Sequence, residues 1–258
     1  MYNETQLREV FHFCFLERLL KLTEPGLYAL KGGVNLRFYF NSPRYSEDMD
    51  LDVFAGRVDT LKKNGYKLLN DAGFKRSLRI YGIEDLELND PAKAKHTDVD
   101  VTQRFRLGLV TSAGQRLPTK VEFSRRQKSK RALVTDLIDP ELARQYRKLS
   151  FRAQHYPGDV AAIQKFKALY GRKVTQARDV FDIGILYAGG HVNAELIMTS
   201  LTKSQKIKAT DCVMSLSYAE FEGQVVEFLL PEIQQDYRSL LSWKRVQDTV
   251  LSLLNPPR

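Results

Sequence analysis

The chain has 258 residues, of which 43% are hydrophobic, so it is long enough to bury a sizeable core in one large domain or two modest ones. Its formal net charge of +9 favours a polyanionic partner such as a nucleic acid. No apolar run is long enough to span a membrane, and no basic region precedes an apolar run at the N-terminus, so the sequence predicts neither a membrane helix nor a secretory signal. We therefore expect a soluble cytoplasmic protein in which Cys14 and Cys212 are free buried thiols.

The N-terminal part begins with apolar residues at helical spacing from Thr5 to Leu22. A short apolar strand, Leu27 to Leu30, then leads into Lys31-Gly32-Gly33. The patterns that follow predict a helix over 34–40, a strand over 49–54 and a helix over 58–72 that Gly73 caps. Alternating and β-branched residues predict further strands over 75–83, 86–89, 98–110 and 117–124.

The character of the chain changes after residue 126. Residues 142–149 suit a short basic helix or a loop, and Asp159 suits a helix N-cap. Helical patterns dominate from there, over 160–170, 177–187, 194–202, 218–229 and 234–254. The fold class is therefore α/β (α+β): a domain with a mixed sheet over residues 1–155, followed by an all-helical C-terminal domain over 156–258.

A glycine pair and an acidic cluster are the first candidate site. Gly32 and Gly33 open a helix, where backbone N–H groups can approach a phosphate closely. Asp48 and Asp50 are two residues apart on a strand, so both carboxylates lie on the same face. Neighbouring carboxylates repel each other unless a cation lies between them, and Mg²⁺ prefers such oxygen ligands. The pattern predicts a magnesium site, with Asp52 as a supporting residue.

A third carboxylate is expected on an adjacent strand. Glu122 interrupts an apolar strand, where a charge is costly unless it is paired or bound to a metal. The competing Asp98-Val99-Asp100 has the same spacing but no glycine pair before it, so a surface ladder is its expected role. A basic segment follows Glu122 and is predicted to bind a nucleic acid or another phosphate, the alternative being a solvated basic face. Its members are Arg125, Arg126, Lys128, Lys130 and Arg131.

The sequence Leu30-Lys31-Gly32-Gly33, with Pro43-Arg44-Tyr45-Ser46-Glu47-Asp48-Met49-Asp50 after it, resembles the AbiEii/AbiGii toxin family of nucleotidyltransferases, in the DNA polymerase β-like superfamily. A second match is similar to the family's helical motifs: Lys165 with Ala168-Leu169, followed by Arg178-Asp179-Val180-Phe181-Asp182. Gln164 and Glu122 depart from the commoner acid and aspartate of the family.

The resemblance implies roles for these residues. Asp48, Asp50 and Glu122 would hold the metal, and Lys165 would contact the nucleotide and be needed for activity. Either Asp179 or Asp182 would position the attacking hydroxyl or hold Lys165, and the family pattern favours Asp179. The remaining nucleotide-binding candidates are Lys31, Gly32, Gly33, Arg44 and Ser46. Ser46 is alternatively a phosphorylation target or a loop hydroxyl that bonds the backbone.

The implied function is that of a toxin that transfers a nucleotide from an NTP to RNA with Mg²⁺, with the tRNA 3′ end as the leading acceptor, and so blocks translation and growth. The basic segment from Arg125 to Arg131 would contact the RNA backbone, and a cognate antitoxin would accompany the toxin. Two alternatives remain open: a nucleotidyltransferase acting on a small molecule or a protein, and a non-catalytic module that binds nucleotides or RNA.

Overall fold

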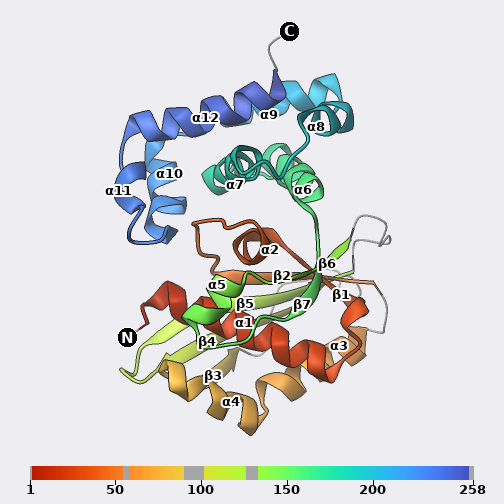
Figure 1. Cartoon of the computed structure of the whole chain (residues 1–258), viewed down its shortest axis with the longest axis vertical. Helices are drawn as coiled ribbons and strands as arrows, with labels where there is room; N and C mark the ends of the chain where they lie inside the picture. Colours follow the sequence, from red (N-terminus) through yellow and green to blue (C-terminus); the bar gives the residue numbers. More distant parts are fainter. Residues whose placement is uncertain (1, 55–57, 90–101, 126–132, 256–258) are drawn as a thin grey trace. The chain divides into compact units, whose positions relative to one another are not determined.

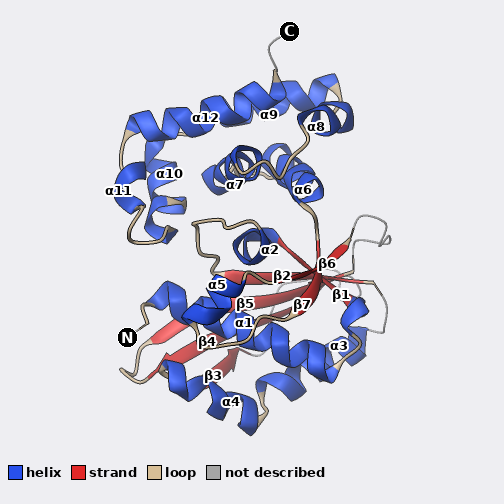
Figure 2. Cartoon of the chain, viewed as in Figure 1, coloured by secondary structure: helices blue, strands red, loops and turns tan. Residues whose placement is uncertain are grey.

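The computed structural model describes residues 2–54, 58–89, 102–125 and 133–255. Its contacts divide the chain into two compact units. The N-terminal unit comprises Met1–Tyr39 and Ser46–Tyr156, and the helical unit comprises Phe40–Tyr45 and Pro157–Arg258. All the named strands belong to the N-terminal unit, as Figure 2 shows in red. None of the described helices is long and apolar enough to cross a membrane.

The N-terminal unit is built on a seven-stranded sheet in the order β3-β4-β5-β2-β1-β7-β6 (Figure 1). The strands are β1 (Tyr28–Lys31), β2 (Asp48–Val53), β3 (Ile83–Asn89), β4 (Thr102–Thr111), β5 (Arg116–Ser124), β6 (Val134–Leu137) and β7 (Arg152–His155). Strand β2 runs parallel to β5 and β1 runs parallel to β7, whereas the other pairs are antiparallel. The predicted mixed sheet is therefore confirmed, although the short strands β6 and β7 were not expected.

Five α-helices accompany this sheet among the described residues. They are α1 (Glu4–Leu22), α2 (Gly32–Tyr39), α3 (Val58–Leu69), α4 (Ala72–Leu78) and α5 (Pro140–Gln145). Helix α1 begins with a capping box in which Asn3 and Gln6 bond each other's backbone N–H groups. The rings of Phe11 and Phe15 are fully buried in the core, and Phe15 contacts Phe123 of β5.

The strand predicted over residues 75–83 is wrong, because α4 and a 3-10 turn (Arg79–Tyr81) occupy most of it. The Asp71 side chain accepts a hydrogen bond from the Phe74 backbone N–H and so caps a new helix. Phe74 and Leu78, four residues apart, are both buried. Gly73 consequently lies inside α4, and the predicted C-cap role for it is wrong as well.

The helical unit contains α6 (Gly158–Gly171), α7 (Ala177–Ala188), α8 (Ala194–Ser200), α9 (Lys203–Ser215), α10 (Tyr218–Gln224), α11 (Gln234–Tyr237) and α12 (Leu240–Leu254). Its core includes Trp243 of α12, which stacks on Phe221 of α10 with ring centroids 4.6 Å apart. The sequence did not predict α9, whose buried residues are only Ala209 and Val213, too few to produce a clear helical period.

The loop between α2 and β2 belongs in part to the helical unit, which the sequence did not predict. The Tyr45 backbone N–H donates to the Phe228 carbonyl at 2.8 Å, and the Leu230 N–H donates to the Pro43 carbonyl at 2.9 Å. These bonds attach residues 40–45 to the segment that follows α10. The chain then returns to the N-terminal unit at Ser46, two residues before β2.

Candidate active site

The first glycine of the pair, Gly32, lies against the side chain of Asp50, one of the predicted metal ligands. Gly32 opens α2 with a φ of +69°, a backbone conformation that side-chain-bearing residues rarely adopt. A Cβ atom at this position would lie 2.9 Å from Oδ2 of Asp50, too close for an ordinary contact. Only glycine therefore permits the α2 backbone and the Asp50 carboxylate to approach as they do.

The three predicted metal ligands and the supporting residue Asp52 lie on one face of the sheet. The parallel register of β2 and β5 places Asp48 opposite Lys120 and Asp50 opposite Glu122. The residues between them, Met49 and Val121 among others, are buried on the other face. We call Asp48, Asp50, Asp52 and Glu122 the acidic face.

Three carboxylates of the acidic face form ion pairs with basic side chains of the same unit. Lys120 Nζ lies 2.9 Å from Asp48 Oδ2, and Arg104 Nη2 lies 2.7 Å from Glu122 Oε2. Asp52 is engaged at both oxygens: Lys31 Nζ lies 2.6 Å from Oδ1, and the Tyr156 hydroxyl donates to Oδ2 at 2.6 Å. Asp52 therefore has the contacts of a supporting residue.

Asp50 is different from its neighbours. Among the residues that the structure describes, none forms a hydrogen bond or an ion pair with its carboxylate. Burial raises the pKa of Asp50 above its ordinary value, and the nearby Glu122 carboxylate raises it further. A cation bound at this point would relieve the repulsion, so Asp50 is the member of the acidic face that gains most from a metal ion.

The acidic face fits a divalent cation by its chemistry. Its carboxylate oxygens are hard donors of the kind that Mg²⁺ prefers, and Asp50 and Glu122 are direct neighbours across two strands. Within residues 2–54, 58–89, 102–125 and 133–255, however, no three acidic, histidine or cysteine side chains converge as a ready set of ligands. The competing pair Asp98 and Asp100 lies outside the described residues.

A second cluster of charges is buried in the helical unit. Lys165 of α6 places Nζ 3.1 Å from Asp179 Oδ1 and 2.5 Å from Asp182 Oδ2, and both carboxylates belong to α7. Neither aspartate side chain is exposed to solvent. Arg172 Nε lies 3.1 Å from the other oxygen of Asp179. The sequence-predicted Lys165 and Asp179 are thus direct partners.

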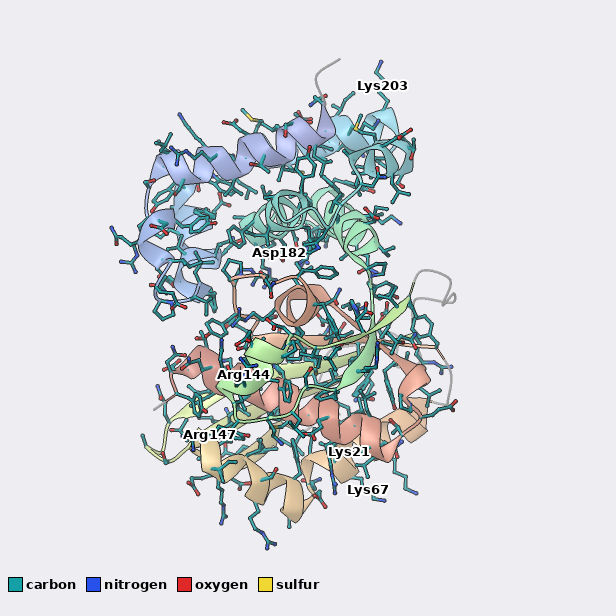
Figure 3. All side chains as sticks on the ribbon, in the orientation of Figure 1. Lys21, Lys67, Arg144, Arg147, Asp182 and Lys203 are labelled. Atoms are coloured by element: carbon teal, nitrogen blue, oxygen red, sulfur yellow. The ribbon has the colours of Figure 1, made fainter. Side chains whose placement is uncertain are left out.

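Asp182 and Arg44 complete this buried cluster. The Arg44 guanidinium donates to Asp182 from Nε at 3.1 Å and from Nη2 at 2.9 Å, and its Nη1 donates to the Tyr45 carbonyl (Asp182 is labelled in Figure 3). Burial alone would raise the pKa of Asp182, but Arg44 and Lys165 together hold it below its ordinary value. Arg44 therefore fastens the loop of residues 40–45 to α7, and a nucleotide contact by Arg44 stays a prediction.

Two further candidates have simpler surroundings. The Ser46 hydroxyl donates to the Asp48 carbonyl at 2.9 Å, the arrangement expected of a loop hydroxyl that bonds the backbone beside the site. Arg125 follows β5 directly and is half-buried. The remaining residues predicted to contact RNA, Arg126, Lys128, Lys130 and Arg131, lie outside the described residues. Arg144 and Arg147 are exposed on the surface of the N-terminal unit (Figure 3).

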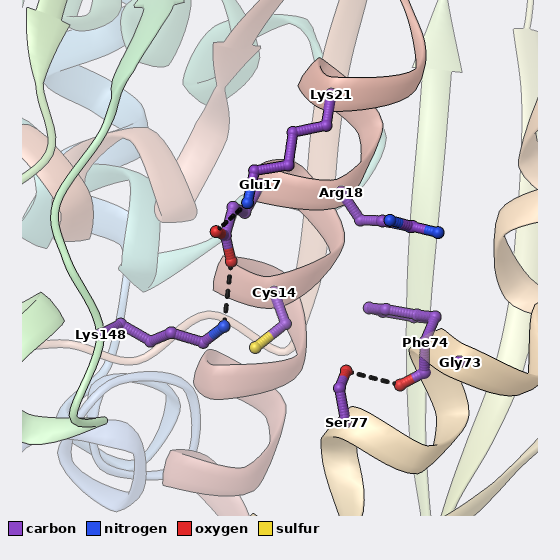
Figure 4. Close-up of a pocket in the computed structure, with 8 residues that line it drawn as sticks. All are labelled: Cys14, Glu17, Arg18, Lys21, Gly73, Phe74, Ser77 and Lys148. Atoms are coloured by element: carbon purple, nitrogen blue, oxygen red, sulfur yellow. Dashed lines mark hydrogen bonds and ion pairs between the residues drawn. The ribbon is translucent and has the colours of Figure 1, made fainter.

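The N-terminal unit also contains a pocket of about 270 Å³ between α1 and α4 (Figure 4). Glu17 lies between two of its lysines, with Lys21 Nζ at 2.6 Å and Lys148 Nζ at 3.0 Å. Cys14 lines the pocket, and burial raises the pKa of its thiol to about 11, which keeps it protonated and unreactive. Cys14 is buried as expected, whereas Cys212 is only partly buried. Glu17 is the one acid among the lining residues, which include three basic residues, Arg18, Lys21 and Lys148.

Comparison with known proteins identifies the family. Residues 14–252 match the family model described as "Nucleotidyl transferase AbiEii toxin, Type IV TA system". No curated protein matches the sequence.

Three solved structures share the fold. MenT4, the nucleotidyltransferase toxin Rv2826c from Mycobacterium tuberculosis, is 16% identical with a TM-score of 0.65, over 99% of this chain and 85% of that one. JHP933 from Helicobacter pylori is 20% identical with a TM-score of 0.57, over 98% and 94%. A putative nucleotidyltransferase from H. pylori is 18% identical with a TM-score of 0.56, over 98% and 97%. Because the family model spans most of the chain, the protein belongs to the AbiEii family of nucleotidyltransferase toxins of type IV toxin–antitoxin systems, which implies an NTP substrate and a cognate antitoxin.

Proposed function

We propose that the protein transfers a nucleotidyl group from an NTP to a hydroxyl of RNA, with the tRNA 3′ end as the favoured acceptor, in a reaction that requires Mg²⁺. The observation that carries this proposal is the position of Asp50, which lies against the backbone of Gly32 and opposite Glu122 in the sheet register. A phosphate-binding backbone and a pair of carboxylates are thereby adjacent, as nucleotidyl transfer requires.

The residues of the acidic face have distinct roles in this proposal. Asp48, Asp50 and Glu122 hold the metal, which supplies charge neutralisation to the triphosphate when it is bound. Gly32 and Gly33 offer backbone N–H groups to the phosphates. The acceptor hydroxyl attacks the α-phosphorus, its proton passes to solvent or a nearby carboxylate, and pyrophosphate leaves. Lys31, held by Asp52, contributes positive charge beside the glycine pair.

In this proposal Lys165 is the residue of the helical unit that contacts the nucleotide. Its Nζ lies between Asp179 and Asp182, which fix the direction of the ammonium group. Asp179 is in turn held by Arg172, whose side chain is 43% exposed and therefore partly free to meet a polyanion. Asp179 and Asp182 act here as positioning residues for Lys165.

An RNA acceptor is favoured by the charge of the chain. The net charge of +9 is attractive to a phosphate backbone and repels cationic small molecules such as many antibiotics. Arg144, Arg147 and Arg152 add exposed guanidinium groups in the N-terminal unit. Addition of nucleotides to a tRNA 3′ end would block aminoacylation, and the cognate antitoxin would prevent the resulting arrest of growth.

The acceptor is tested by incubating the protein with each α-labelled NTP, Mg²⁺ and separate pools of tRNA, ribosomal RNA and protein. The proposal predicts that the tRNA becomes labelled, that nucleases acting on the 3′ end release this label, and that no label is incorporated when EDTA is present in the reaction. Label in ribosomal RNA or in protein would assign a different acceptor, and the absence of label with every NTP would refute the proposal.

A further inference from the structure

The acidic face carries its own set of counterions. Its four carboxylates face three cations, Lys31, Lys120 and Arg104, so the ionised face has one formal negative charge in excess. A divalent metal ion would turn that excess into one positive charge. The ionised face therefore carries a formal charge of −1 without a metal and +1 with one, and a positive face is the state that an anionic triphosphate prefers.

Lys120 is the cation best placed to respond to a metal. It lies opposite Asp48 in the register of β2 and β5, and its Nζ is 2.9 Å from Asp48 Oδ2. Its side chain is 25% exposed, so the ammonium can leave Asp48 without being trapped in the core. Lys31, in contrast, is bound to an aspartate that Tyr156 also holds.

A metal ion and Lys120 cannot use the same oxygen of Asp48 freely, because two cations repel each other at such short range. In the structure, three of the four carboxylates are paired with cations, and no converged set of metal ligands is found within the described residues. The ion pairs and the missing ligand set are both explained if Asp48 becomes a metal ligand only after Lys120 has left it.

We propose that Lys120 occupies Asp48 in the metal-free protein and moves to the phosphates of the NTP when the metal binds. This inference rests on the proposed nucleotide transfer. It gives Lys120 two successive roles: its ammonium neutralises Asp48 before the metal binds, and it contacts the phosphates of the NTP afterwards. Lys120 thereby couples metal binding to NTP binding, since the metal releases the ammonium that the triphosphate then uses.

The test compares Lys120→Met with wild type in two titrations. Mn²⁺ alone is titrated and followed by the electron paramagnetic resonance signal of the free ion. A non-hydrolysable α,β-methylene analogue of each NTP is then titrated at saturating Mn²⁺. Lys120→Met should bind Mn²⁺ about fivefold more tightly, because the competing cation is gone. It should bind the analogue about tenfold more weakly, because a charge-assisted hydrogen bond to phosphate is lost.

Lys75→Met is the matched control. Lys75 is 26% exposed and its Nζ is 2.6 Å from Asp85 Oδ1, so this variant breaks a similar ion pair away from the acidic face. It should leave both affinities unchanged. Lys120→Arg, which keeps the charge, should stay close to wild type in the Mn²⁺ titration, and thermal unfolding of each variant confirms that it is folded.

Each outcome is decisive for Lys120. Unchanged Mn²⁺ affinity in Lys120→Met would overturn the proposed competition between Lys120 and the metal for Asp48. Unchanged affinity for the analogue would overturn the proposed phosphate contact of Lys120. A wild-type protein that binds Mn²⁺ and the analogue but transfers no nucleotide would contradict the proposed function and leave the Lys120 comparison readable. A wild-type protein that binds no Mn²⁺ would overturn both.

Discussion

Replacing Asp182 by asparagine should destabilise the helical unit severely. The carboxylate is wholly buried and receives both Nε and Nη2 of Arg44 as well as Nζ of Lys165. Asparagine keeps the shape of the side chain but not its charge. The buried Arg44 and Lys165 would then lack the negative charge of Asp182 to balance theirs. Removing one partner of a buried ion pair costs about 3–5 kcal/mol, and the remaining contacts of Lys165 with Asp179 place the expected loss at the lower end, about 3 kcal/mol.

The single tryptophan provides the assay, because Trp243 is buried in the helical unit and stacked on Phe221. Its fluorescence during urea unfolding reports the free energy of unfolding of that unit. Asp236→Asn is the matched control, since Asp236 is exposed, and it should change the free energy by less than about 0.5 kcal/mol. A loss below about 1 kcal/mol in Asp182→Asn would show that the cluster behaves like a surface ion pair and would refute this reasoning.

Three further predictions concern the N-terminal unit. Gly32→Ala should weaken NTP binding about tenfold or more, because its Cβ would displace the Asp50 carboxylate, whereas Gly114→Ala, with a similar φ of +74° and no atom nearby, should leave titrated NTP affinity unchanged. Tyr156→Phe should lower the urea-derived free energy of unfolding by about 1 kcal/mol, since Asp52 loses a hydrogen bond, and no change would contradict that bond. Burial lowers the pKa of His12 from 6.5 to about 3. Between these two pH values the His12 imidazole is therefore protonated in the unfolded chain and neutral in the folded chain. Stability should therefore fall by about 1.4 kcal/mol per pH unit between pH 6.5 and 3 from this group, and His12→Gln should show a shallower fall in urea titrations at pH 7.5 and 5.5.

The parts of the site that the sequence predicted depend on short-range rules. The side-chain alternation of a strand places Asp48 and Asp50 on one face, and an isolated acid in an apolar strand led to Glu122. The structure places these three on one face of the sheet, with Asp50 directly opposite Glu122. The counterion Lys120 was missed, although it lies two residues before Glu122 and hence on the same face, a signal that the same alternation rule contains.

The parts that the sequence could not predict depend on contacts between distant segments. Arg44 and Asp182 are 138 residues apart, and nothing local to either residue indicates that they are partners. The same holds for the loop of residues 40–45, whose backbone bonds to the segment after α10 assign it to the helical unit. The error over residues 75–83 was different in kind, because a cap at Asp71 overrode an ambiguous apolar pattern.

The most direct test of the account is metal-dependent nucleotide transfer by Asp50→Asn compared with Asp85→Asn. Both are single aspartate-to-asparagine changes on the same sheet, but Asp85 is paired with Lys75 at the surface, away from the acidic face. Release of labelled pyrophosphate from NTP in the presence of RNA and Mg²⁺ is the measurement. If Asp50 holds the metal, pyrophosphate release should fall by at least about a hundredfold in Asp50→Asn and stay near the wild-type rate in Asp85→Asn. Equal activity in the two variants would contradict this role of Asp50.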